Sequence, residues 1–200
     1  MDAPEGLRRD DPHAWDRLID AAGPSAMLVR VEAALGARFR GQVGVDEIWR
    51  ETLLRTWRVR ESLDWSGLPA FRRQLLAIAE EVIKEQLEDG EGGRVTPMPR
   101  RSSGSVHAGP IAFTSPARAS ADREEAFAMR YALDRLSPEF RYVVWLSEFE
   151  ELSPQTIAER LELDLPEVQD RLRRGTIAFR HKLRTVRQEK AAEPTEETWF

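Results

Sequence analysis

The residues best suited to binding chemistry form a basic run near the end of the chain. Between Arg171 and Arg187 the sequence has no acidic residue. The cations of this run are Arg171, Arg173, Arg174, Arg180, Lys182, Arg184 and Arg187. Guanidinium and ammonium groups clustered in this way bind phosphates, although the whole chain carries a net charge of −5. The run therefore predicts a local surface for a nucleic-acid backbone on an otherwise acidic protein.

Other kinds of site find little support among the 200 residues. The absence of cysteine excludes disulfides and thiolate metal sites. His13, His107 and His181 are far apart, and no pair has the helical spacing of a metal site. No glycine-rich phosphate loop precedes a helix, and no nucleophile with a partner base can be picked out. We therefore expect no enzyme, no metal and no cofactor.

Two predicted helices must position the basic run. Helices near 154–162 and 166–187 are joined by a short turn, "ELDL". The first begins at "SPQT", with serine as N-cap and proline at the first helical position; the second begins at "DLPE", with Asp164 as cap and Glu167 as a capping-box partner. The residues expected to face inward across the turn are Ile157, Ala158, Leu161, Leu163, Val168 and Leu172. This apolar pattern is typical of a helix-turn-helix that presents its second helix to the DNA major groove.

The second helix supplies the candidate DNA contacts. The side chains expected at its exposed start are Glu167, Gln169, Asp170, Arg173 and Arg174, followed by Arg180, Lys182 and Arg184 for phosphates. An ordinary helical hairpin with a basic, solvated face is the alternative interpretation.

The complete chain predicts an all-α fold of two small helical domains joined by a flexible linker. Helical periodicity predicts further helices near 13–21, 25–39, 45–60, 69–88, 122–136 and 138–150, and no alternating strand pattern occurs. The predicted segments are a first domain over 12–89, a Gly-, Pro- and Ser-rich linker over 90–121, a helix-turn-helix domain over 122–187 and an acidic tail over 188–200. We expect the tail, which ends in "EPTEETWF", to be disordered, with a docking peptide as the alternative.

A longer stretch contains this helix-turn-helix: "ALDRLSPEFRYVVWLSEFEELSPQTIAERLELDLPEVQDRLRRG". It resembles the fourth region of the extracytoplasmic-function group of bacterial sigma-70 factors. "DEIWRETLLRTWR" resembles the second-region helix that docks on RNA polymerase, and "FRRQLLAIAEEVIKEQLE" the helix that opens the −10 element. The resemblance implies a sigma factor that directs promoter-specific transcription initiation, with core RNA polymerase and promoter DNA as partners. An anti-sigma or other regulatory protein is a further candidate partner.

The resemblance also assigns residues. It implies −35 contacts by Gln169, Arg171, Arg173 and Arg174. It implies polymerase docking by Asp46, Glu47, Trp49, Arg50, Glu51 and Leu54. The amino terminus lacks the apolar run of a signal peptide, and no stretch approaches the roughly 20 apolar residues of a membrane span. We therefore expect a cytoplasmic protein without membrane contact.

The stretch "IAEEVIKEQLED", residues 78–89, departs from the family pattern. The family typically offers Asn, Asp and Arg near the positions of Glu81, Glu85 and Glu88. Carboxylates repel phosphates, so this face suits melted promoter DNA poorly. Three interpretations follow: a solvated face with a Glu80–Lys84 ion pair, an acidic patch for a basic protein partner, or a real loss of −10 engagement.

Two rival functions remain open at this stage. A sigma-like interaction module with impaired promoter opening would regulate transcription through partner binding. A conventional dimeric helix-turn-helix regulator would explain the second domain but would leave the first without a role.

Overall fold

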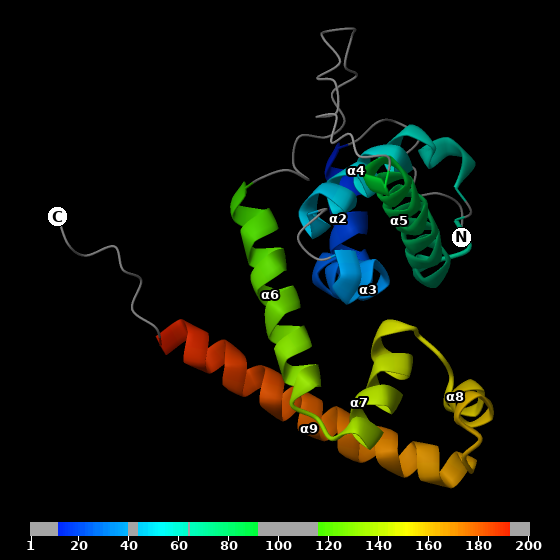
Figure 1. Cartoon of the computed structure of the whole chain (residues 1–200), viewed down its shortest axis with the longest axis vertical. Helices are drawn as coiled ribbons and strands as arrows, with labels where there is room; N and C mark the ends of the chain where they lie inside the picture. Colours follow the sequence, from blue (N-terminus) through cyan, green and yellow to red (C-terminus); the bar gives the residue numbers. More distant parts are fainter. Residues whose placement is uncertain (1–11, 40–43, 64, 92–115, 193–200) are drawn as a thin grey trace, which may run out of the picture. The chain divides into compact units, whose positions relative to one another are not determined.

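The computed structural model describes residues 12–39, 44–63, 65–91 and 116–192 (Figure 1). Every regular element in these ranges is helical and none is a strand, which confirms the predicted all-α class. None of the helices in the described part of the chain is long and apolar enough to cross a membrane. The chain divides into two compact units, one ending at Arg123 and the other beginning at Glu124. Most of the predicted linker and the whole "EPTEETWF" segment lie outside the described residues.

The first unit is built on four α-helices. They are α2 (Pro12–Ala22), α3 (Pro24–Phe39), α4 (Val45–Arg58) and α5 (Leu68–Glu91), with a 3-10 turn, η1 (Arg60–Ser62), after α4. All four lie where the periodicity predicted them. Trp15 is completely buried among α2, α4 and α5, and its ring meets that of Trp57 edge-on at 5.3 Å. This aromatic contact places α4 beside α2, as expected for an edge-to-face pair.

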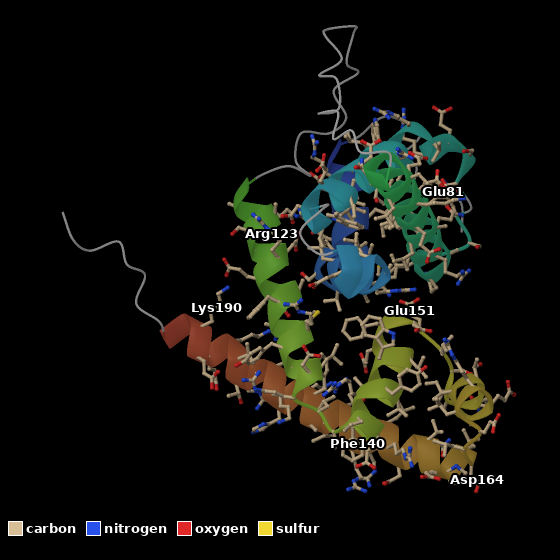
Figure 2. All side chains as sticks on the ribbon, in the orientation of Figure 1. Glu81, Arg123, Phe140, Glu151, Asp164 and Lys190 are labelled. Carbon is tan, nitrogen blue, oxygen red and sulfur yellow. The ribbon has the colours of Figure 1, made fainter. Side chains whose placement is uncertain are left out.

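A second apolar cluster joins α3, α4 and α5. Its buried members are Val31, Leu35, Ile48, Ala79, Val82 and Ile83. The apolar half of "IAEEVIKEQLED" is therefore core, and its acids are left on the outer face of α5, where Figure 2 shows Glu81. Packing of α4 against α5 fixes which side chains of the two helices can meet at the surface.

The division between the two units falls within α6 (Pro116–Asp134), whose residues from Glu124 onward belong to the second unit. The second unit then contains α7 (Pro138–Val144), a π-helical turn η3 (Trp145–Phe149), α8 (Pro154–Leu161) and α9 (Leu165–Ala192). In Figure 1, α7 lies against α9 and α8 precedes the start of α9. Close packing of α7 on α9 is possible because the buried Gly175 has no side chain. A Cβ there would lie 2.9 Å from Val144 Cγ2 and 3.2 Å from Phe140 Cβ.

Three helix limits differ most from the prediction, and α5 also continues past the predicted residue 88 to Glu91, so that residues 90 and 91 of the predicted linker are helical. The helix predicted over 138–150 changes to π-helical hydrogen bonding after Val144, and α9 continues beyond residue 187 to Ala192. α6 begins at Pro116, so residues 116–121, which the sequence had assigned to the linker, are helical. The reason is the signal already used at Pro138 and Pro154: proline at the first position of a helix loses no hydrogen bond.

Candidate nucleic-acid interface

The support for the candidate interface begins at α8. The hydroxyl of Ser153 accepts a hydrogen bond from the backbone N–H of Thr156 at 3.1 Å, which confirms the predicted N-cap. At the other end of α8, Glu162 adopts the left-handed conformation, with φ 54°, and Leu163 N–H donates to Ala158 C=O at 3.0 Å. This is a Schellman-type end, in which the left-handed residue is usually glycine. It makes the tight turn into α9.

Apolar packing across the turn agrees with the predicted helix-turn-helix. Ile157, Ala158 and Val168 are buried in one cluster, and Leu161, Leu163, Leu165 and Leu172 pack against it. Burial of these side chains holds α8 against one face of the first turns of α9. The opposite face of these turns faces solvent.

Two charged residues that sequence reasoning missed hold this unit together. Glu150 accepts a hydrogen bond from Trp145 Nε1 at 2.8 Å and another from Arg160 at 2.7 Å, so it ties η3 to α8. Arg141 donates to the carbonyls of Leu133 and Leu136 at 3.1 and 3.0 Å, which satisfies acceptors at the end of α6. Neither role has a sequence signal, because each depends on a loop returning to a helix.

The predicted DNA-contacting residues all lie on α9. Glu167, Gln169, Arg173, Arg174 and Arg180 are exposed. Asp170, Arg171 and Lys182 are half-buried. All eight residues therefore lie on one helix, distributed from its first turn to its middle.

The arginines at the start of α9 form ion pairs with acidic side chains of the same helix. Asp170 pairs with Arg173 at 2.7 Å and with Arg174 at 3.4 Å. Hydrogen bonds from Arg173 and then Arg174 hold the pKa of Asp170 below its usual range. Glu167 was expected as a capping residue, but its carboxylate forms an ion pair with Arg171 one turn along the helix. These acids lower the positive charge that the first turns present.

The basic character is stronger further along α9. Arg180, Lys182 and Arg184 form no ion pair with any residue in the described ranges. Beyond them, Arg187 pairs with Glu125 at 3.0 Å and Lys190, labelled in Figure 2, pairs with Glu124 at 3.1 Å, both acids on α6. The cations in the middle of α9 are therefore the ones available to bind an external anion.

Comparison with known families bears on this unit alone. Residues 124–176 match the family model of sigma-70, region 4. The match supports a relationship with the sigma-70 family over this segment. It includes the helix-turn-helix and the first turns of α9, while Arg180 and Lys182 lie outside the region 4 segment. A search of curated proteins finds no match to the chain.

Before the region 4 segment, α4 carries the residues that the resemblance assigned to polymerase docking. Asp46 and Glu47 are exposed, and Asp46 pairs with Arg123 at 3.1 Å. Glu51 is held by Arg55 at 2.9 Å. The remaining three, Trp49, Arg50 and Leu54, belong to the wall of one pocket.

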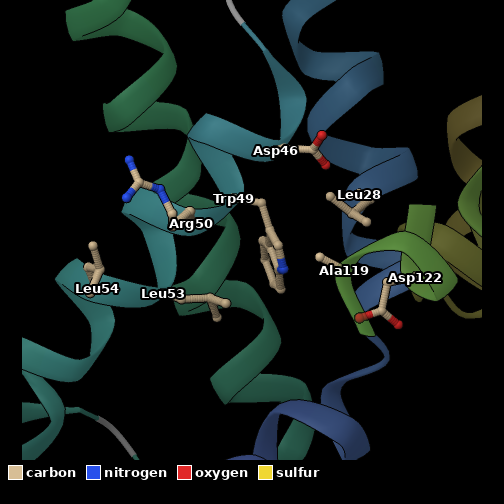
Figure 3. Close-up of a pocket in the computed structure, with 8 residues that line it drawn as sticks. All are labelled: Leu28, Asp46, Trp49, Arg50, Leu53, Leu54, Ala119 and Asp122. Carbon is tan, nitrogen blue, oxygen red and sulfur yellow. The ribbon is translucent and has the colours of Figure 1, made fainter. Parts of the chain in front are cut away.

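This pocket, of about 170 Å³, is shown in Figure 3. Its lining consists of Leu28, Asp46, Trp49, Arg50, Leu53, Leu54, Ala119 and Asp122. The wall is mostly apolar, with Arg50 and the two acids at its polar positions. Burial raises the pKa of Asp122, whose carboxylate accepts a hydrogen bond from Ser25 Oγ at 3.4 Å. An apolar hollow with a few polar groups can accept a side chain of a partner protein.

The acidic face of α5 is joined to α4 by an ion pair that the sequence did not predict. Glu85 receives two hydrogen bonds from Arg55 of α4, at 2.9 and 2.7 Å. The predicted pair between Glu80 and Lys84 is wrong, because Lys84 instead approaches Glu88 at 3.9 Å. Periodicity allows Lys84 either neighbour, and only the side-chain conformation decides between them.

Proposed function

We propose that this protein is a sigma factor of the extracytoplasmic-function type. In this role it binds core RNA polymerase, reads the −35 and −10 elements and directs promoter-specific initiation in the cytoplasm, without catalysing a reaction itself. The observation that carries the proposal is the region 4 match over a helix-turn-helix whose second helix is exposed and rich in arginine. A separate helical unit before it, with the expected docking residues on one helix, supports the same role.

Each unit has its own task in this proposal. Gln169, Arg171, Arg173 and Arg174 contact the −35 bases and their phosphates, while Arg180 and Lys182 contact the backbone. Glu167 and Asp170 shape that surface by holding the arginines. Asp46, Glu47, Trp49, Arg50, Glu51 and Leu54 meet the polymerase, with the pocket beside Trp49 receiving an apolar side chain of that partner.

Transcription in vitro with purified core polymerase tests the proposal. The protein should copurify with the polymerase and stimulate transcripts from selected promoters. Arg50→Glu combined with Leu54→Asp should abolish copurification, whereas Arg73→Glu, on an exposed side chain of α5, should preserve it. Arg173→Ala should weaken promoter binding by about tenfold or more. Absence of both polymerase binding and stimulated transcription would refute the proposal.

A second candidate is a sigma-like module that regulates transcription through partner binding and opens promoters poorly. The observation in its favour is the carboxylate face of α5, where Glu80, Glu81 and Glu88 are exposed beside the Arg55–Glu85 pair. Permanganate footprinting of the −10 element separates the two candidates. Normal opening by the unaltered protein, unchanged by Glu81→Asn, Glu85→Asp and Glu88→Arg together, would reject the second candidate. Opening only by the triple variant would favour it.

A further inference from the structure

The first two turns of α6 lie against the helices of the first unit. We call residues 117–123 the α6 start, and all of them belong to that unit. Arg118, Ala119 and Asp122 are half-buried, whereas Ala121 is exposed. Spacings of three and four residues place the first three on one face of a helix. The α6 start therefore packs on the first unit through this face.

Polar contacts hold the α6 start on α2 and α3. Arg118 forms an ion pair with Asp20 of α2. Asp122 accepts a hydrogen bond from Ser25 Oγ of α3 at 3.4 Å. None of these four residues belongs to the set expected to dock on polymerase. Their contacts therefore position the segment without using the docking residues.

The α6 start also engages two residues that the proposed polymerase docking uses. Arg123 pairs with the carboxylate of Asp46 at 3.1 Å. Ala119 lines the pocket beside Trp49, and Figure 3 shows the Trp49 ring directed from α4 toward Ala119. A partner that binds both Asp46 and Trp49 must therefore take the place of the α6 start.

The contact between the α6 start and α4 is loosely packed and polar. Ala119 is small and leaves a pocket of about 170 Å³ beside it. Arg123 and Asp46 are 54% and 53% exposed, and exposed ion pairs contribute little to stability. Polar, imperfectly packed contacts are typical of interfaces that open and close. A larger apolar side chain from a partner would fill the space that Ala119 leaves.

We propose that the α6 start is an autoinhibitory segment, which covers Asp46 and Trp49 in the free protein and is displaced when core polymerase binds. The proposal rests on the polymerase docking proposed above and adds its regulation. Because the segment belongs to the same chain, even weak contacts give it a high effective concentration at the site. The apparent affinity for polymerase is then reduced to the fraction of molecules in which the segment is released.

A disulfide tests the docking of the segment without polymerase. The chain has no cysteine, and the side chains of Ser25 and Asp122 approach within 3.4 Å. The full-length Ser25→Cys, Asp122→Cys variant should therefore form an intramolecular disulfide under mild oxidation. In the matched variant, Ser25→Cys with Ala121→Cys, the second cysteine is on the exposed side of the same helical turn, so it should react at least about tenfold more slowly. Equal rates would overturn the proposal, because the segment would not be held on α3.

The same disulfide tests the competition with polymerase. Once it is oxidised, the Ser25→Cys, Asp122→Cys variant cannot release the α6 start. It should then bind core polymerase at least about tenfold more weakly than its reduced form, and a reductant should restore binding. The unaltered protein, treated with the same oxidant, should bind as before. Oxidised and reduced forms that bind alike would overturn the proposal.

A weaker contact should have the opposite effect. Arg118→Gln removes the ion pair with Asp20 and leaves every docking residue in place. It should increase the affinity for core polymerase about two- to fivefold, a small factor because the ion pair is partly exposed. Arg73→Gln, at an exposed position of α5, removes the same charge and should have no effect. An unchanged affinity of Arg118→Gln, or an equal increase in both variants, would overturn the proposal.

These outcomes differ from a failure of the proposed function. Absence of polymerase binding by the unaltered protein and by Arg118→Gln would reject the sigma-factor role and, with it, the competition. Polymerase binding and stimulated transcription by the unaltered protein, together with equal binding of the oxidised and reduced disulfide variant, would support the sigma-factor role and reject the autoinhibition alone.

Discussion

Arg55 of α4 holds the carboxylate of Glu85 of α5 with two parallel hydrogen bonds, from Nη1 to Oε1 at 2.9 Å and from Nη2 to Oε2 at 2.7 Å. The pair joins two helices that also share a buried core. Glu85 therefore differs from the other exposed acids of α5: it is part of the connection between helices. The acidic face combines one structural carboxylate with several that remain toward solvent.

Glu85→Gln should reduce the free energy of unfolding at neutral pH by roughly 0.5–1 kcal/mol, a small value because the Glu85 side chain is 56% exposed. Hydrogen bonding from Arg55 lowers the pKa of Glu85 in the folded protein. The contribution is therefore complete above the unfolded pKa of about 4.3 and disappears as the pH falls through the lower folded pKa. Urea unfolding of both proteins at neutral and acidic pH measures this.

The matched control for this change is Glu81→Gln, on the exposed face of the same helix. It removes the same charge from a residue for which no ion pair is found within the described ranges. An equal loss of stability in the two variants would contradict the role of the Arg55–Glu85 pair.

Gly175→Ala should destabilise the second unit by up to about 2 kcal/mol. The added Cβ would lie 2.9 Å from Val144 Cγ2, so α7 must move away from α9. Overpacking of this kind costs about 1–3 kcal/mol, against which alanine gains roughly 1 kcal/mol over glycine in helix propensity. Thermal unfolding followed by circular dichroism measures the net effect. Val144→Ala makes room for the new methyl group, so the double variant should be more stable than the sum of the single changes allows, and simple additivity would argue against the contact.

Glu162→Gly should stabilise the helix-turn-helix by about 0.5–1 kcal/mol. Glu162 has φ 54°, in a region that disfavours residues with a Cβ, whereas glycine adopts it without strain. Glu159→Gly is the control, since it removes the same charge from inside α8 and should destabilise by about 1 kcal/mol. Chemical denaturation of both variants checks the opposite signs, and a shared sign would contradict the left-handed turn.

Asp170→Asn should increase DNA affinity about two- to tenfold at low salt, because it releases Arg173 and Arg174 and removes one repulsive charge. The increase should shrink as salt is raised, as for any exposed charge. Fluorescence anisotropy with duplex DNA over a salt series measures it. Glu162→Gln removes an equal charge from the turn before α9, and an effect as large as that of Asp170→Asn would show that the ion pairs with the arginines are irrelevant.

Helix positions and the inward-facing side of the helix-turn-helix were predictable from the sequence. Ile157 and Val168 repeat at helical spacing, and Ser153 with Pro154 marks a helix start, so local rules sufficed. The start of α6 at Pro116 could have been predicted by the same rule, but the surrounding Gly-, Pro- and Ser-rich composition favoured a linker. The π-helical turn after Val144 has no comparable signal.

The pairing of charges was much less predictable. Arg55 and Glu85 meet because α4 packs on α5 in one register, which a periodic pattern does not specify. Arg141 finds its carbonyls through the turn between α6 and α7, also a tertiary contact. The choice of Lys84 between Glu80 and Glu88 depends on side-chain conformation. The predicted DNA and polymerase contacts concern partners outside the chain and remain predictions.

The length of α9 has a consequence of its own. The helix is anchored twice, at Gly175 against α7 and near its end, where Arg187 and Lys190 hold α6. Each residue turns the helix by about 100°, so both anchors can be satisfied only if the number of residues between them is right. One inserted residue would leave the composition and charge of α9 almost unchanged while setting its two ends out of phase. The direction in which Arg173 points relative to α6 therefore depends on the number of residues between the two anchors.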